Sequence, residues 1–204
     1  MVDNSAIKLY NIDILKRRFI MEGTNQKITK SHRAVLDMVY TAMFSALICV
    51  CSLISVPIGE VPVTLQTFAM CLTGAMLGWK RGGMSVLIYV LLGAAGLPVF
   101  AEGKGGIGII TGATGGYIVG FIFTALIVGF AAEKFDKKLI PLAISMVIGV
   151  AVCYALGTAW FMFVTKMDLL TSLGYCVIPF IIFDAIKIIF ATIMVNRLSK
   201  IIKL

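Results

Sequence analysis

The chain has 204 residues, of which 60% are hydrophobic and only 14% are charged, and its mean hydropathy is +1.01. A soluble domain is typically about 45–50% apolar and about 25% charged, so this composition excludes an ordinary soluble protein and indicates a membrane protein. The formal net charge is +8, but the basic residues precede the first apolar run or mark loops, without interleaved aromatics, so nucleic-acid recognition is excluded as well.

Apolar segments of membrane-spanning length follow a basic leader, residues 1–36. Prolines mark helix ends near Pro57, Pro62 and Pro98, and Pro141 opens the fifth segment, while Pro179 predicts a kink within the last one. The sequence therefore predicts an all-α bundle of six transmembrane helices over residues 37–196, with a basic tail at 197–204. The expected segments are 37–56, 63–79, 83–100, 114–132, 139–164 and 173–196.

The leader itself allows two interpretations. Residues 7–20 mix apolar and basic positions, which is compatible with an amphipathic helix on the inner leaflet and equally with a disordered segment. The first 36 residues lack an apolar core, so no cleavable signal peptide is expected.

The distribution of basic residues predicts the topology. Fifteen of the 18 lysines and arginines fall in the leader, in the 2–3 and 4–5 connections and in the tail, whereas the other side holds only Lys104 and Lys166. Because cytoplasmic loops are enriched in Lys and Arg, both termini are expected in the cytoplasm.

The five cysteines all lie in apolar runs, form no CxxC motif and are odd in number, and the single histidine is His32. We therefore expect free, buried thiols, with neither a disulfide framework nor a metal site. The sequence has no His pair, serine nucleophile elbow or metal-ligand spacing, so a membrane enzyme is disfavoured. It also lacks a GxxxxGK[ST] motif, so a transporter of this sequence would take its energy from an ion gradient or from partner subunits.

A glycine-rich stretch, residues 103–116, separates the third and fourth segments. It formally contains GxGxxG but follows an apolar helix rather than a strand, which argues against a dinucleotide site. Gly105 and Gly106 belong instead to a flexible segment that lets the backbone approach a ligand, or to a permissive surface connection.

Polar groups inside the apolar segments are the strongest functional signal. Asp184 and Lys187 are the only carboxylate and ammonium in the run 174–195, near the middle of a spanning helix. A charge at that depth costs about 2.5–3.5 kcal/mol even on lenient scales, and the three-residue spacing places both side chains on one face. They form either an ion pair that locks helices together or a site for a ligand with an anion and NH donors. Gln66 and Thr67, at the start of the second segment, are similarly either ligand-binding or helix-packing groups.

Small residues four positions apart occur in three segments, at Ala42 and Ala46, at Gly74 and Gly78, and at Gly116 and Gly120. Such patterns allow close helix approach, either within the bundle or against a partner.

Three stretches resemble the BioY family, the biotin-binding S components of energy-coupling factor (ECF) vitamin transporters. They are VPVTLQTFAMCLTGAMLG (61–78), YVLLGAAGLPVFAEGKGGIGIITGATGGYIVGF (89–121) and PFIIFDAIK (179–187), and the resemblance covers about residues 37–196. It implies a multi-pass protein of a prokaryotic cell membrane that captures biotin from outside, without enzymatic activity or a cofactor of its own. It further implies a transmembrane T subunit and two cytoplasmic ATPases as partners.

The resemblance also assigns roles to particular residues. Lys187 is expected at one polar end of biotin, with the end left open, while Asp184, Gln66 and Thr67 serve the ureido group. Phe100 and Tyr117 are expected to form the walls around the rings of biotin, and the loop with Gly105 and Gly106 is expected to close over the ligand. Ala42 and Ala46 match the AxxxA pattern that docks the T subunit. Two alternatives remain at this point: another vitamin as the ligand, and a stand-alone carrier driven by a proton or sodium gradient.

Overall fold

The computed structural model describes residues 31–56 and 61–201, so the interpretation of residues 7–20 lies outside the described part. The chain divides into two units, Met1–Val39 and Tyr40–Leu204. The helix Ser31–Leu53 already includes residues 31–36, which the sequence assigned to the leader. Its unbroken apolar stretch gives it a mean hydropathy of 2.0.

Four helical segments within the described residues are long and apolar enough to cross a bilayer: Ser31–Leu53, Gly115–Lys134, Leu139–Thr165 and Leu169–Ile201. The last is divided at Val177 into α6 (Leu169–Cys176) and α7 (Ile178–Ile201), two residues before Pro179. Pro179 is the second residue of α7, where the first backbone N–H groups have no helical partner, so the expected kink is present, slightly earlier than the proline itself. Helix α7 continues to Ile201, so most of the predicted tail is helical.

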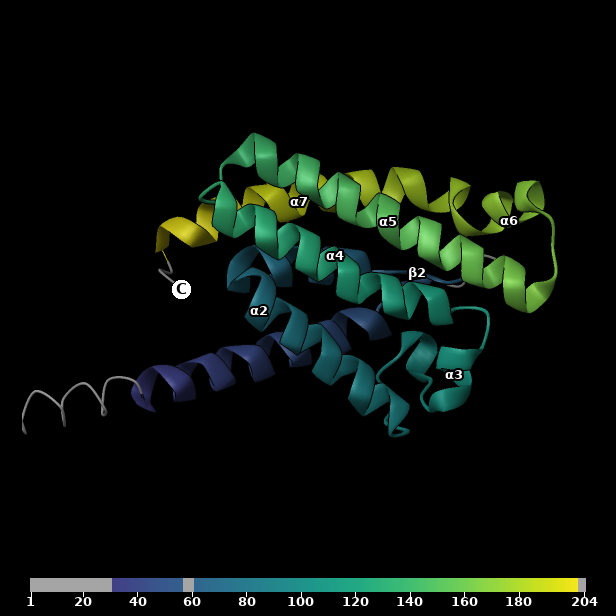
Figure 1. Ribbon diagram of the computed structural model, residues 1–204, viewed down its shortest axis with the longest axis horizontal. Coiled ribbons are helices and arrows are strands. Elements are labelled where there is room, and N and C mark those ends of the chain that lie inside the picture. The colour runs from purple at the N-terminus through teal and green to yellow at the C-terminus, as the bar shows by residue number, and fades with distance from the viewer. Residues whose placement is uncertain (1–30, 57–60, 202–204) are drawn as a thin grey trace, which may run out of the picture. The chain divides into compact units, whose positions relative to one another are not determined.

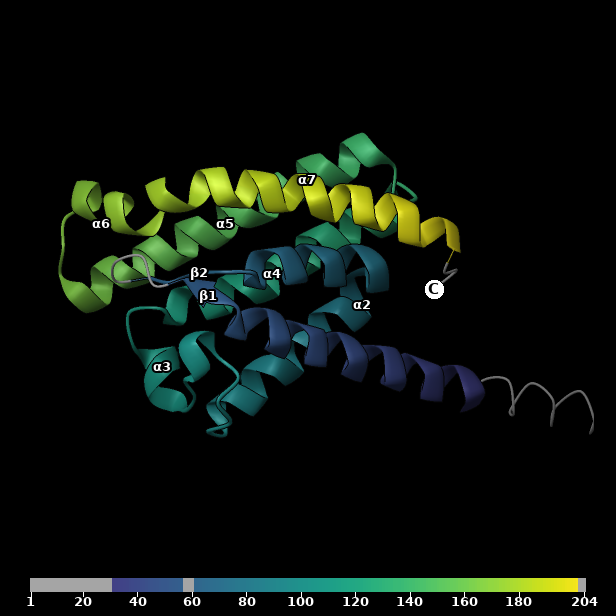
Figure 2. The same cartoon turned by 180° about the vertical axis from the view of Figure 1, so that it is seen from behind.

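The second and third predicted segments form one broken helix, α2 (Gln66–Ala94), which changes direction sharply at Gly78. Gly78 has φ 78° and ψ 179°, a conformation essentially restricted to glycine. The two arms meet at an angle in Figure 2, and a Cβ on Gly82 would lie 3.0 Å from the Cα of Gly74. At about 1.5 Å per residue the first arm is about 18 Å long, shorter than the roughly 30 Å hydrocarbon core. The helix ends at Ala94, so the prediction that it continues to residue 100 is wrong.

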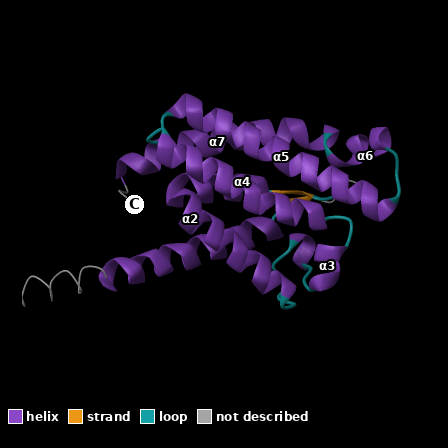
Figure 3. Ribbon diagram, in the orientation of Figure 1, coloured by secondary structure: helices purple, strands orange, loops and turns teal. Residues whose placement is uncertain are grey.

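Short elements of secondary structure precede and follow this helix. The strands β1 (Ser55–Val56) and β2 (Val63–Thr64) pair antiparallel just before α2, and they are the short orange arrows of Figure 3. After α2 come a 3₁₀ turn, η1 (Ala101–Gly103), and the short helix α3 (Ile107–Thr111). The glycine-rich stretch is therefore a folded connection that contains a helix.

Helix α4 (Gly115–Lys134) packs between α2 and α5 (Leu139–Thr165), as Figure 1 shows. Glycines allow these helices to approach each other closely. A Cβ on Gly74 would lie 2.6 Å from the carbonyl oxygen of Ala125 in α4, and one on Gly120 would lie 2.8 Å from the sulfur of Cys153 in α5. The glycine patterns of these helices thus serve packing within the bundle.

Two apolar clusters make up the core. One gathers around Tyr89, Phe100 and Tyr117, and the other around Leu72, Met146 and Val195. Along α7 the first cluster includes Phe180 and the second begins with Ala191, so Asp184 lies between them.

Candidate ligand-binding site

A cavity of about 340 Å³ opens among the beginnings of α2, α4 and α7. Its lining is about equally polar and apolar, and the polar side chains come from β2, α2, α5, α7, the start of α4 and the connection after α2. A concave site in which aromatic and aliphatic walls converge with polar groups is typical of small-molecule binding. The lining residues are Val61, Pro62, Thr64, Gln66, Thr67, Phe100, Ala101, Glu102, Lys104, Ile109, Thr114, Tyr117, Ile118, Phe121, Tyr154, Phe180, Asp184 and Lys187.

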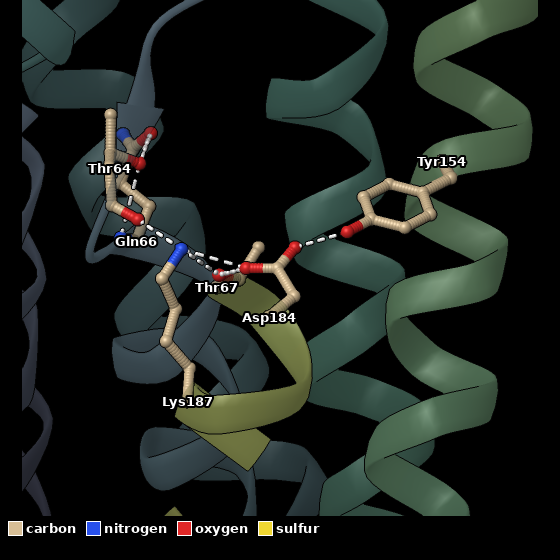
Figure 4. A network of polar contacts seen from close by, with 6 residues as sticks. All are labelled: Thr64, Gln66, Thr67, Tyr154, Asp184 and Lys187. Atoms are coloured by element: carbon tan, nitrogen blue, oxygen red, sulfur yellow. Dashed lines mark hydrogen bonds and ion pairs between the residues drawn. The ribbon is translucent and has the colours of Figure 1, made fainter. Parts of the chain in front are cut away.

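The two charges of α7 form a direct ion pair in the cavity wall. The Nζ of Lys187 lies 2.7 Å from Oδ1 of Asp184, and the side chains are only 11% and 4% exposed. The distance confirms that the i, i+3 spacing brings these two groups together. Figure 4 shows the pair at the centre of a network that reaches α2 and α5.

Lys187 binds acceptors from the neighbouring hairpin and helix. Its Nζ donates to the backbone carbonyl of Thr64 at 2.6 Å and to Oγ1 of Thr67 at 3.3 Å, in addition to Asp184. An ammonium group has three N–H donors, so these partners account for all of them.

Asp184 accepts hydrogen bonds on both oxygens. Oδ1 accepts from Thr67 Oγ1 at 2.7 Å and from Lys187, and Oδ2 accepts from the hydroxyl of Tyr154. A carboxylate has about four acceptor positions, and three are used within the described residues. The remaining position on Oδ2 can accept an N–H from a ligand.

Gln66 and the two predicted wall aromatics also lie at the cavity. Gln66 Oε1 accepts from the Thr64 hydroxyl at 3.0 Å, and its Nε2 donates to the hydroxyl of Tyr89. The ring of Phe100 meets Tyr89 edge-on, with centroids 5.5 Å apart and an interplanar angle of 82°. Tyr117 is fixed by a 2.7 Å hydrogen bond from its hydroxyl to the carbonyl of Cys176. These residues are therefore oriented by bonds within the protein.

The two predicted loop glycines shape the connection rather than line the cavity. A Cβ on Gly105 would collide with the carbonyl oxygen of Leu97, and Gly106 has φ +98° and donates its N–H to the Gly93 carbonyl at 2.7 Å. Between α2 and α3, the residues that line the cavity are Phe100, Ala101, Glu102 and Lys104.

Known proteins resemble this chain over most of its length. The BioY family profile matches residues 24–204. A biotin transporter BioY of Thermotoga maritima is 43% identical over 80% of this chain and 96% of its own length, and a probable one of Pyrococcus horikoshii is 41% identical over 78% and 93%. The chain belongs to the BioY family.

A solved structure agrees with this assignment. The crystal structure of the S component for biotin from an ECF-type ABC transporter superposes with a TM-score of 0.78, at 33% identity, covering 83% of this chain and 93% of the other. This BioY chain is thus a multi-pass membrane protein with the helical fold of an S component. The relatives are named as transporters rather than as enzymes.

Sequence reasoning did not assign Tyr154, Glu102 or Lys104 to the site of this BioY chain. A tyrosine in an apolar helix carries only a weak signal, because its ring fits the core and its hydroxyl partner is unknown before folding. Glu102 and Lys104 are charged residues in a glycine-rich connection, where solvent exposure is the ordinary expectation. Their place at the cavity depends on the turn after α2.

Ala42 and Ala46 are exposed on the first helix, whereas Phe44, Ser45 and Ile48 are buried. The five cysteines are free, and all but Cys49 are buried. Among the described residues, no three potential ligand side chains gather to hold a metal ion.

Proposed function

We propose that this chain is the biotin-binding membrane subunit, or S component, of an ECF-type vitamin transporter. The observation that carries the proposal is the cavity in which the buried Asp184–Lys187 pair faces aromatic walls. It occurs in a chain that is 43% identical to a named biotin transporter.

The functional groups of biotin are complementary to those that line this cavity. Its ureido group offers two N–H donors and one carbonyl acceptor, and its fused rings and valerate chain are apolar. The remaining acceptor position of Asp184 suits a ureido N–H, and Gln66 and Thr67 lie beside it. Phe100 and Tyr117 supply apolar contact for the rings. The cavity volume of about 340 Å³ falls at the lower end of the roughly 300–1,000 Å³ found for small-molecule sites.

The proposal includes six membrane passages with both termini in the cytoplasm, the two arms of α2 counting as the second and third. Basic residues support this topology. Lys138 precedes α5 and Lys166 caps its far end, so the two lie at opposite ends of the bundle. At the Lys138 end, Lys137 donates to the carbonyl of Met76 at 3.2 Å, and burial together with the nearby Arg81 guanidinium lowers the pKa of Lys137. The 2–3 and 4–5 connections therefore share one face, the one rich in Lys and Arg.

The cavity lies at the opposite end of the bundle from the connections rich in Lys and Arg. Thr114 and Tyr117, at the start of α4, line it, whereas Lys134 ends the same helix. With the basic end in the cytoplasm of a prokaryotic cell, the cavity receives its ligand from outside.

We assign the energy for transport to partner proteins. The sequence has no P-loop, and the related crystal structure is of an S component from an ECF-type ABC transporter. We assign a transmembrane T subunit and two cytoplasmic ATPases as partners. The exposed Ala42 and Ala46 offer the T subunit a close-approach face.

The first experiment is calorimetric titration of the purified chain with biotin, with other vitamins as competitors. We expect tight binding in the nanomolar range, about −12 kcal/mol, that unrelated vitamins do not displace. Displacement of biotin by another vitamin would reassign the ligand, and absence of binding by folded protein would refute the proposal.

Uptake measurements test the partner assignment. Cells that express this chain with the T subunit and both ATPases are expected to accumulate labelled biotin far faster than cells that express the chain alone. Uptake by the chain alone that collapses with an uncoupler would instead indicate a gradient-driven carrier.

A further inference from the structure

The cavity has two separate charged regions. The first is the Asp184–Lys187 pair of α7, and the second is Glu102 and Lys104 in the connection between α2 and α3. Glu102 and Lys104 form a salt bridge, with side chains 31% and 58% exposed, so this region lies at the rim of the cavity. Among the described residues, Lys104 and Lys187 are the cations that line the cavity.

The inner region is poorly suited to a carboxylate. All three N–H donors of Lys187 already have acceptors, in Thr64, Thr67 and Asp184. A ligand carboxylate that bound Lys187 would have to displace one of them. It would also lie beside the Asp184 carboxylate, only 2.7 Å from the same Nζ, and like charges at such a short range repel strongly.

The inner region favours a neutral group that donates N–H bonds. The ion pair has no net charge, and Asp184 keeps one acceptor position on Oδ2. An anionic group of the same ligand must then lie toward the other cation, Lys104.

The connection holds Lys104 in place at the rim. The carbonyl of Lys104 accepts from the N–H of Phe100 at 2.9 Å, and the N–H of Gly106 donates to the Gly93 carbonyl at 2.7 Å. Both bonds tie the turn to the wall that contains Phe100. Glu102 has φ 60°, in the left-handed region that non-glycine residues rarely adopt. Its carboxylate is paired with the ammonium group of Lys104.

We propose that Lys104 is the counter-ion for the carboxylate of the ligand and that Glu102 competes for it. The inference rests on the proposed function, since it takes biotin as the ligand, and it adds an orientation: ureido group toward Asp184, valerate carboxylate toward Lys104. Lys104 thus makes the site specific for a free acid, and the Glu102 carboxylate limits the affinity.

The test compares biotin with biotinamide, in which a neutral amide replaces the carboxylate, in calorimetric titrations of the full chain. We expect Lys104→Gln to weaken biotin binding by about fivefold, between the small effect of an exposed ion pair and the larger effect of a buried charged hydrogen bond. Biotinamide affinity is expected to stay unchanged. Lys104→Arg should retain preference for the acid. Glu102→Gln should strengthen biotin binding by about threefold, because a competing anion is removed.

Lys166→Gln is the matched control, since Lys166 is an exposed lysine that does not line the cavity. It is expected to leave both affinities unchanged, which separates a local contact from a general effect of net charge. Salt dependence gives a second readout. Raising the ionic strength from about 0.05 to about 0.5 M shortens the Debye length about threefold, so it should weaken biotin binding to the wild-type chain more than to Lys104→Gln.

Equal affinities of Lys104→Gln and wild type for biotin would overturn the proposal, as would equal losses for biotin and biotinamide. Either result leaves the proposed function intact as long as the wild-type chain binds biotin. Failure of the wild-type chain to bind either compound would instead refute the proposed function itself.

Discussion

Asp184 and Lys187 come from one helix turn but are held by three other parts of the fold. Lys187 reaches the hairpin carbonyl of Thr64, Thr67 on α2 bonds to both charges, and Tyr154 on α5 donates to Asp184. Burying two charges is expensive, and mutual attraction repays the cost only when the remaining donors and acceptors are satisfied. The pair therefore ties α2, α5 and α7 together, in addition to the role in ligand binding that we propose for it.

This dual role predicts non-additive effects on stability. Lys187→Met leaves the Asp184 carboxylate buried and unpaired, so the free energy of unfolding should fall by about 3 kcal/mol or more. The double variant Asp184→Asn with Lys187→Met should be more stable than Lys187→Met alone, since no charge remains unpaired. Thermal unfolding in detergent measures both. Additive losses would show that the two groups do not interact in solution.

The same substitutions are expected to weaken biotin binding. Asp184→Asn should reduce the binding free energy by more than about 1.5–3 kcal/mol, because a hydrogen bond to a charged group is lost. Titration of folded variants measures the loss. Wild-type affinity in a folded Asp184→Asn variant would remove Asp184 from the site.

Tyr154→Phe tests the hydrogen bond from α5. Its hydroxyl donates to Asp184, so removal should lower the free energy of unfolding by about 1–3 kcal/mol. Tyr175→Phe is the control, because Tyr175 is 43% exposed and does not line the cavity, and it should change stability by less than about 0.5 kcal/mol. Equal effects of the two variants would argue against a specific role for the Tyr154 hydroxyl.

At the scale of elements, the break in α2 determines where the cavity forms. Gly78 reverses the chain so that the first arm brings Gln66 and Thr67 toward α7, while the second arm carries Tyr89 to Gln66. The carboxylate of Glu133 accepts the N–H of Trp79 just after the break, at 3.2 Å. Helix α4 thus satisfies a backbone donor that the break leaves without a helical partner.

Gly78→Ala should therefore be strongly destabilising. Its φ of 78° and ψ of 179° cost a non-glycine residue about 1–3 kcal/mol, and the added Cβ would also collide with the Glu133 side chain. Gly174→Ala on α6 is the matched control, since its Cβ meets nothing within 4 Å, and it should be neutral or slightly stabilising. Chemical unfolding measures the stability of both variants. Equal stability of Gly78→Ala and Gly174→Ala would contradict the role of Gly78 in the break.

Sequence reasoning located the helices better than their breaks. Long apolar runs predict α4, α5 and the Pro179 kink, because hydropathy and proline act locally. The basic Lys80 and Arg81 correctly separate two segments, but the turn occurs at Gly78, since the positive φ there needs a glycine. The helix within residues 103–116 was missed, because seven glycines outweigh its short apolar stretch, residues 107–111.

The site was predictable only where its chemistry is local. Asp184 and Lys187 share one turn, and a charge pair in an apolar run is visible in the sequence. The hydrogen bonds of Lys187 to Thr64 and of Tyr154 to Asp184 join residues 123 and 30 positions apart, and these depend on how α7 packs on α2 and α5. Glu102 and Lys104 required the turn that folds the connection over Phe100.

At the scale of the whole molecule, the proposed ligand site and the proposed docking face for a partner lie on different parts of the protein. The cavity opens among the beginnings of α2, α4 and α7, whereas Ala42 and Ala46 are exposed on the first helix and do not line it. We therefore expect that the proposed ligand capture and the proposed docking of a partner can be changed independently.

Ala42→Trp is expected to abolish biotin uptake by the full complex and to leave binding by the purified chain unchanged, because a bulky ring prevents close helix approach. Ile182→Trp is the control, since Ile182 is 70% exposed on a different helix, α7, and does not line the cavity, and it should retain uptake. Loss of binding in Ala42→Trp would place Ala42 within the packing of the bundle.

The most direct test of the account is a crystal structure of the chain with biotin. We expect biotin in the cavity lined by Gln66, Tyr117 and Asp184, with the ureido group on Asp184 and the carboxylate toward Lys104. Biotin bound elsewhere on a folded chain would contradict the cavity as the ligand site, and a carboxylate on Lys187 would reverse the proposed orientation.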